Sequence, residues 1–164
     1  MAAIVYGWGN VLKKKQIMGY QWCPSCGSFK PEYLSKLVFR VHISYIPIFK
    51  KTKGYFIACP GCEKGREITK EQFKELKEKF KPMTNSLSKK CFKELTQVCA
   101  TCTECSETTV QGIFYQMAQK YPISATEELT AEYRQLIIDL ISERLERERM
   151  MLQQQQMMLQ QNQM

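Results

Sequence analysis

The sequence has one histidine, no long apolar run and no recognisable secretory leader, and each absence removes a class of function. The histidine, His42, falls on the polar side of a predicted strand, and no serine, cysteine or carboxylate constellation accompanies it for acyl transfer. No apolar run approaches the roughly 20 residues that span a bilayer. The opening MAAIVYGWGN has no basic residue before its short apolar stretch, so we expect no signal peptide. We therefore expect a soluble, non-catalytic, intracellular protein of the cytoplasm or nucleus.

The positive charge of the chain is concentrated in its first half. The 164 residues carry a formal net charge of +8. Residues 1–83 contain 16 Lys or Arg against 6 Asp or Glu, whereas residues 84–164 contain 8 against 10. An acidic partner, whether RNA, DNA, an anionic membrane surface or an acidic protein, is therefore expected to meet the first half. The length allows one ordinary domain, or a small domain with an appendage, and leaves little room for a large catalytic cleft.

Four of the eight cysteines occur in two Cys-Pro-x-Cys turns, and these turns predict a metal site. The ligands would be Cys23, Cys26, Cys59 and Cys62. Without a secretory signal, paired Cys-x-x-Cys motifs are more often metal ligands than disulfides. A two-residue spacer lets both sulfurs reach one ion at about 2.3 Å, and two turns complete a closed tetrahedron that stabilises the fold. Such a site holds zinc or a single iron; we expect one zinc ion, with iron as the alternative.

The residues around the two turns predict a sheet followed by helices. Alternation from Leu37 to Phe49 is typical of a half-buried strand whose odd positions face the core. A polar turn over residues 50–54 and a second strand over residues 55–58 would deliver Cys59. Thr69 and Gln72 form a capping-box pattern, which predicts a helix from about Lys70 that ends before Pro82. The sequence thus divides into a metal-binding domain over residues 1–82, a Cys-rich helical segment over 83–123 and a long helix over 124–164.

Several distinctive motifs occur together between Ile4 and about Leu76. They are Gly7-Trp8-Gly9, the first Cys-Pro-x-Cys turn, Tyr45-Ile46-Pro47-Ile48-Phe49, Tyr55-Phe56 and the second Cys-Pro-x-Cys turn. In this combination the chain resembles a small family of zinc-ribbon proteins. The resemblance implies an α+β fold with a rubredoxin-like zinc ribbon, a short antiparallel sheet and the same four cysteine ligands, and it implies no activity. Glu63 stands where that family usually has glycine, which bears on the left-handed geometry of the second turn.

A second group of cysteines follows the ribbon: Cys91, Cys99, Cys102 and Cys105. If residues 87–105 formed one continuous helix, Cys91 and Cys105 would lie about 21 Å apart along its axis, too far to share an ion. In that helix the cysteines share an apolar stripe, where cysteine packs as a small hydrophobic residue. Thr101 and Thr103 are poor helix formers that could break the helix near Cys102. We expect buried thiols; a second metal ion, which requires the break, and redox chemistry are the alternatives.

Two lysine clusters lie close to aromatic residues in the first half: Lys13, Lys14 and Lys15, and Lys50, Lys51 and Lys53. Basic residues beside aromatic rings can bind phosphates and stack bases, although lysine-rich turns are commonly only solvated. A nucleic-acid-binding zinc ribbon is therefore the second hypothesis. The third is a rubredoxin-like iron electron carrier, because 32 residues separate Cys26 from Cys59. The basic charge and the helical tail argue against it.

The last segment predicts one long helix from Ser124, with Ser124 and Glu127 as its capping box. A regular coiled coil is not expected, because Glu148 and Gln155 fall at core positions. The Gln- and Met-rich end, residues 150–164, is expected to bind a protein partner. Its sequence pattern does not specify an oligomeric state. The leading hypothesis is a zinc-binding structural or interaction module without catalytic activity.

Overall fold

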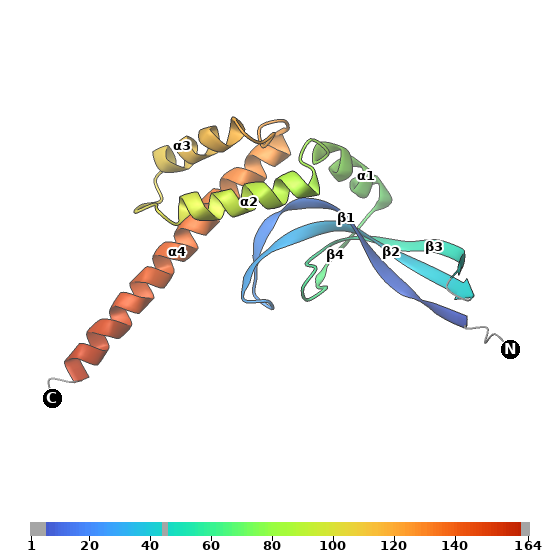
Figure 1. Ribbon diagram of the computed structural model, residues 1–164, viewed down its shortest axis with the longest axis horizontal. Coiled ribbons are helices and arrows are strands. Elements are labelled where there is room, and N and C mark those ends of the chain that lie inside the picture. Colours follow the sequence, from blue (N-terminus) through green and yellow to red (C-terminus); the bar gives the residue numbers. More distant parts are fainter. Residues whose placement is uncertain (1–5, 44–45, 162–164) are drawn as a thin grey trace. The chain divides into compact units, whose positions relative to one another are not determined.

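The computed structural model describes residues 6–43 and 46–161, and the chain divides into two compact units. Unit 1 extends to Asn85 and unit 2 begins at Ser86. The described part of unit 1 contains a four-stranded antiparallel sheet and a helix, whereas unit 2 is helical (Figure 1). This is the α+β fold that the sequence predicts, with the paired cysteine turns on a sheet and helices after it. The predicted segments 83–123 and 124–164 lie in unit 2, apart from the first three residues.

The strands are longer than the sequence predicts. They are β1 (Tyr6–Cys23), β2 (Ser28–Ile43), β3 (Ile46–Ala58) and β4 (Gly65–Ile68), adjacent in that order. The alternating stretch 37–49 is therefore shared between β2 and β3, and the turn predicted over residues 50–54 is wrong. Those residues pair with β2, with Lys50 opposite Arg40 and Gly54 opposite Leu37. Among the described residues of this stretch, Val38 is the one that is buried, and it is an even position. The prediction that the odd positions face the core is therefore also wrong.

The core of unit 1 lies between the sheet and helix α1 (Lys70–Lys79). Leu34, Ile57 and Phe73 are buried together, and Met18, Tyr55, Ile68 and Leu76 pack around them. The predicted capping box is confirmed: Thr69 Oγ1 accepts from the Gln72 N–H at 3.1 Å, and Gln72 Oε1 accepts from the Thr69 N–H at 2.9 Å. α1 ends at Lys79, three residues before Pro82, as predicted.

Strand β1 has two irregularities, and Asn85 satisfies the backbone groups that they release. The pairing with β2 shifts between Lys14 and Gln16 and again between Ile17 and Gly19. Asn85 donates from Nδ2 to the Lys15 carbonyl at 3.0 Å and accepts on Oδ1 from the Ile17 N–H at 2.7 Å. Bulges leave such groups without a ladder partner, so this side chain stabilises the irregular segment.

The described part of unit 2 consists of α2 (Asn85–Cys99), whose first residue belongs to unit 1, α3 (Glu107–Ala118) and α4 (Glu127–Gln161). α4 begins later than predicted, because Thr126 rather than Ser124 caps it, accepting from the Leu129 N–H at 3.2 Å. The fully buried side chains of α4 include Leu129, Tyr133, Leu136, Ile137 and Ile141. In this core the Tyr133 hydroxyl is hydrogen-bonded to Ser88 Oγ at 3.0 Å. Across the described residues, every helix is too short or too polar to cross a membrane.

Candidate metal centre

The four predicted cysteine ligands of unit 1 lie together at one end of the sheet. Their Sγ atoms all lie within 4.8 Å of one another, with 3.6 Å between Cys23 and Cys62 and 3.8 Å between Cys26 and Cys59. Sulfurs at about 2.3 Å from a central ion in a tetrahedron are about 3.8 Å apart. The sulfur positions therefore fit a tetrahedral metal ion, and all four ligand positions are taken by protein.

The two cysteine turns have the same backbone conformation. In the first, the Cys26 and Gly27 N–H groups donate to the Cys23 carbonyl at 3.0 and 2.9 Å. In the second, the Glu63 N–H donates to the Cys59 carbonyl at 3.0 Å. The residue after each second cysteine is left-handed, with φ of 60° at Gly27 and 58° at Glu63. The second turn thus has left-handed geometry although position 63 is glutamate and not glycine.

The pKa values of two of the thiols are shifted in opposite directions. Burial raises the pKa of Cys59, but the N–H groups of Cys62 and Gly61 lower it, and the result is about 7. The hydrogen bond with Cys23 and then burial raise the pKa of Cys26 to about 12. Without a cation, the Cys26 thiol therefore keeps its proton. A divalent metal reverses this preference, because its charge stabilises adjacent thiolates.

Sequence reasoning missed two contributions near the second turn. Gly61 lies so close to the first turn that an added Cβ would be 3.0 Å from Cys26 Sγ. Lys64 Nζ donates to Ser25 Oγ at 3.0 Å and thereby links the two turns. The glycine of the Cys-Pro-Gly-Cys turn could have indicated the close approach of Gly61 to the first turn. The hydrogen bond between Lys64 and Ser25 depends on tertiary structure, and no local pattern indicates it.

Glu63→Gly is expected to stabilise unit 1 by about 1 kcal/mol. The left-handed backbone conformation at this position is strained for a residue with a Cβ atom, and glycine adopts it without strain. The measurement is the midpoint of urea unfolding of the metal-loaded protein. Glu63→Ala is the matched control, since alanine keeps the strain and removes only the carboxylate. An equal gain in both variants would locate the effect in the charge and contradict the backbone explanation.

The cysteines of the second group are dispersed over α2 and the loop after it. Cys91 and Cys99 are buried, Cys102 is half-buried and Cys105 is exposed. Over the described residues, the group close enough to hold a metal consists of the four unit 1 cysteines and includes none of these. Burial raises the pKa of Cys91 and of Cys99 to about 12, so both thiols are neutral. The expected buried thiols that pack as small apolar side chains are therefore found at Cys91 and Cys99, whereas the expectation is wrong for the exposed Cys105.

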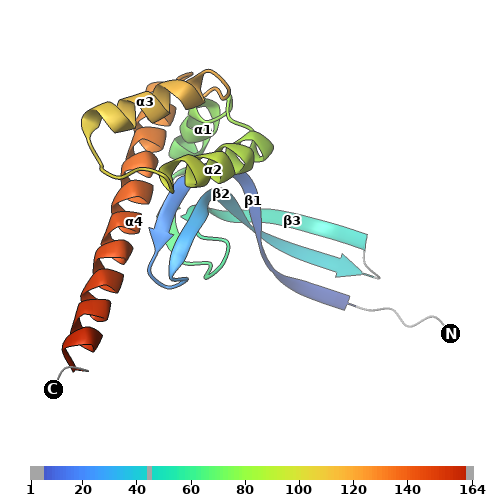
Figure 2. The same ribbon diagram turned by 60° about the vertical axis from the view of Figure 1, so that its left-hand side comes forward.

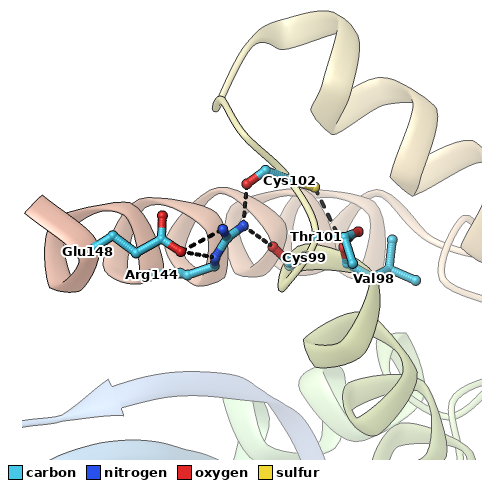
Figure 3. Close-up of polar contacts among 6 residues, drawn as sticks. All are labelled: Val98, Cys99, Thr101, Cys102, Arg144 and Glu148. Carbon is cyan, nitrogen blue, oxygen red and sulfur yellow. Dashed lines mark hydrogen bonds and ion pairs between the residues drawn. The ribbon is translucent and has the colours of Figure 1, made fainter.

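Helix α2 ends at Cys99, three residues before the break that its threonines could make near Cys102, and side chains bind carbonyls at and just after its end. The Thr101 hydroxyl donates to the Val98 carbonyl at 2.9 Å. Figure 3 shows that the Arg144 guanidinium of α4 also reaches this end, donating to the carbonyls of Cys99 and Cys102 while it pairs with Glu148. The last carbonyls of a helix lack partners within it and carry partial negative charge, which a guanidinium complements.

Arg144→Met is expected to destabilise unit 2 by about 1–3 kcal/mol, because it keeps the apolar stem and leaves the two carbonyls without their charged donor. Thermal unfolding followed by circular dichroism measures the loss. Arg147→Met, which removes an exposed guanidinium paired with Glu143, is the control and should change stability by less than about 1 kcal/mol. Equal losses would show that Arg144 acts only through its surface ion pair.

Of the two predicted lysine clusters, Lys50, Lys51 and Lys53 lie near the end of the sheet where β2 meets β3, whereas Lys13, Lys14 and Lys15 lie in the middle of β1. Lys13 and Lys50 are near Arg40. The charge of Arg40 is the largest cause of the lowered pKa of Lys13, followed by the burial of Lys13 and the charge of Lys50. Lys51 is paired with Phe39, and Lys53 Nζ lies 5.0 Å from the centre of the Phe39 ring. His42 lies across β1, where a Cβ on Gly7 would be 2.3 Å from its ring, so this glycine makes room for it. The structure thus brings Lys13 within electrostatic reach of Lys50 but places the two clusters in different rows of the sheet.

No protein-family model matches the chain, and no similar curated protein or solved structure is found, so its likeness to a zinc-ribbon family rests on the motifs and the sulfur geometry.

Proposed function

We propose that this chain is a non-catalytic interaction protein whose sheet is held together by one structural zinc ion. The tetrahedral spacing of the four sulfurs carries the proposal. With four protein ligands the metal has no position for water or substrate, which is typical of structural rather than catalytic zinc. Thiolate ligands require a reducing setting, so we assign the protein to an intracellular compartment.

The element proposed to bind a protein partner is the end of α4. Six large apolar side chains there are exposed: Met150, Met151, Leu152, Met157, Met158 and Leu159. Methionine side chains are flexible and polarisable, and surfaces rich in them adapt to different partners. Contact of so many apolar side chains with water is unfavourable, and exposed apolar patches commonly mark binding sites, which supports a role in binding.

Metal analysis of the purified, untagged full chain tests the zinc proposal. We expect one zinc per chain in the wild-type protein, near-zero zinc in Cys26→Ser and an unchanged zinc content in Cys105→Ser. The absence of bound metal from protein purified under reducing conditions would overturn the proposal. Iron with a visible thiolate-to-iron absorption would replace zinc and favour the electron-carrier hypothesis. Two metals per chain would indicate that the second cysteine group also binds a metal ion.

The partner-binding part is tested with Leu152→Ser and Leu159→Ser in one chain. We expect this variant to lose the partners that wild-type protein captures in its native cell, while keeping its zinc and its unfolding temperature. Gln153→Ser is the matched control. Identical partners for all three proteins would rule out this end of α4 as the binding element.

A further inference from the structure

The end of the sheet opposite the cysteine turns has a composition that the zinc proposal does not explain. We define the distal sheet end as residues 6–12 of β1, 37–43 of β2 and 46–54 of β3, which pair with one another. Figures 1 and 2 show these strands running on past α1, toward the side where the N-terminus lies. In this region the sheet therefore presents side chains that the core of unit 1 does not use.

The outermost part of the distal sheet end is apolar and exposed. Trp8 is 75% exposed, Ile46 68%, Ile48 61% and Phe49 50%. Trp8 of β1 and Phe49 of β3 lie in one row of the sheet, because both are paired with Val41 of β2. Residues 41–49 contain no Asp, Glu, Lys or Arg. We call Trp8, Ile46, Ile48 and Phe49 the apolar tip.

Cationic side chains begin in the next row of the sheet. There Gly9, Arg40 and Lys50 are paired across β1, β2 and β3, and the row after it contains Lys51. The distal sheet end contains four Lys or Arg and no Asp or Glu. The four, which we call the cation collar, are Arg40, Lys50, Lys51 and Lys53. The positive charge extends along β1 to Lys13, whose pKa is lowered chiefly by Arg40.

The spacing of tip and collar corresponds to the depth of a membrane interface. Ile46 lies three residues beyond Phe49, or about 10 Å at roughly 3.3 Å per strand residue. Apolar surfaces of peripheral proteins enter about 5–10 Å into the boundary between headgroups and acyl chains. With the tip at that depth, Arg40, Lys50 and Lys51 reach the level of lipid phosphates. Tryptophan, as at position 8, is the side chain that prefers this boundary.

We propose that the distal sheet end is a peripheral membrane-binding site that takes an anionic lipid surface. The tip supplies apolar contact, and the collar supplies attraction to negative headgroups, which is worth about 1 kcal/mol per cation near the surface. Binding of this kind needs no transmembrane helix.

Two other occupants fit the distal sheet end less well. A single-stranded nucleic acid stacks its bases on aromatic rings, but Ile46 and Ile48, two of the most exposed side chains, are aliphatic. A second copy of the same surface would bring two cation collars together without a single acidic residue to pair them.

Vesicle binding by the full chain tests the proposal. The vesicles are pure phosphatidylcholine, or phosphatidylcholine with about a third phosphatidylserine, a composition chosen for its negative surface charge. Trp22→Phe leaves Trp8 as the single tryptophan, whose emission should shift to shorter wavelength on the anionic vesicles only. Raising NaCl from 0.1 to 0.5 M should weaken binding at least about tenfold, because the collar is screened.

Substitutions separate the tip from the collar. Lys50→Gln with Lys51→Gln should weaken vesicle binding roughly 30-fold, and Ile48→Ser about tenfold. The controls are Lys74→Gln with Lys77→Gln on exposed positions of α1, and Tyr115→Ser, which removes an exposed aromatic of α3; both should bind like wild type. Unfolding temperatures verify that every variant is folded.

Three results would overturn the proposal. The first is an unshifted Trp8 emission on anionic vesicles. The second is equal loss of binding in the control and distal variants. The third is tight binding of a single-stranded RNA oligonucleotide that depends on Trp8 and Lys50 while vesicles do not bind, which would assign the surface to nucleic acid.

Discussion

Removal of the metal is expected to unfold unit 1 and leave unit 2 folded. Unit 1 has a small buried core for a sheet of long strands: Leu34, Ile57 and Phe73 form one cluster, and the other buried apolar side chains include Ile17, Tyr20, Val38, Phe80 and Met83. Structural zinc contributes apparent binding free energies of about 10–16 kcal/mol in small zinc domains, which exceeds the usual stability of a domain of this size. Unit 2 has its own core around α4, with Leu129, Leu136 and Ile137 almost fully buried. Loss of the metal should therefore remove the strand signal and retain the helical one.

Circular dichroism with excess chelator, followed by heating, measures this separation. We expect the chelated protein to show one helical transition, and the metal-loaded protein to show a further transition that zinc restores. Cys59→Ser should behave like the chelated protein at any metal concentration. Cys91→Ser is the matched control, because Cys91 is also buried and lies in unit 2. A chelated protein that unfolds like the loaded one would contradict a structural role for the metal.

The parts of the molecule that could be predicted from the sequence depend on local chemistry. The two cysteine turns are such a case, since a two-residue spacer brings two sulfurs to one ion whatever surrounds them. The capping box at Thr69 is another, because both of its hydrogen bonds are made within one turn of helix. The pairing of the two cysteine turns with each other also followed, since a closed tetrahedron needs four sulfurs.

The limits of the strands could not be predicted, because they depend on pairing. Lys50 to Gly54 has the composition of a turn, yet β2 supplies ladder partners that hold it extended. An exposed strand tolerates lysines, since only its backbone needs to be satisfied. The start of α4 was misplaced for a similar reason: Ser124 and Thr126 both have a hydroxyl suited to capping, and only the path of the chain selects Thr126.

The second cysteine group shows how a tertiary contact settles a local ambiguity. The stripe from Leu87 to Cys105 fits one helix, whereas the threonines after Cys99 oppose it. The structure ends α2 at Cys99 and places the Arg144 guanidinium against the carbonyls of Cys99 and of Cys102 in the loop that follows. Arg144 lies 45 residues away from Cys99 in the sequence, so no local pattern contains this interaction.

Gly65→Ala is expected to destabilise unit 1 by about 3 kcal/mol and to weaken metal binding at the same time. An added Cβ at this position would lie 2.1 Å from the Ile57 carbonyl oxygen and 2.7 Å from the Ala58 Cα. Both are backbone atoms of β3, so no side-chain rotation relieves the overlap, and overpacking of this kind costs about 1–3 kcal/mol or more. β3 must move away from β4, and Ala58 directly precedes the ligand Cys59. The displacement therefore reaches the sulfur positions.

Gly9→Ala is the matched control for this prediction, because Gly9 also lies in a strand and a Cβ there has no other atom within 4 Å. Alanine at position 9 should leave stability unchanged or raise it by up to about 1 kcal/mol, since it restricts the unfolded chain. The measurements are thermal unfolding of the loaded proteins and competition for zinc with a chromophoric chelator. If Gly65→Ala lowered stability but left zinc affinity at the wild-type value, the ligand geometry would be independent of the β3 and β4 contact. Parallel losses in both would show that close packing of these two strands positions Cys59 and Cys62 for the metal.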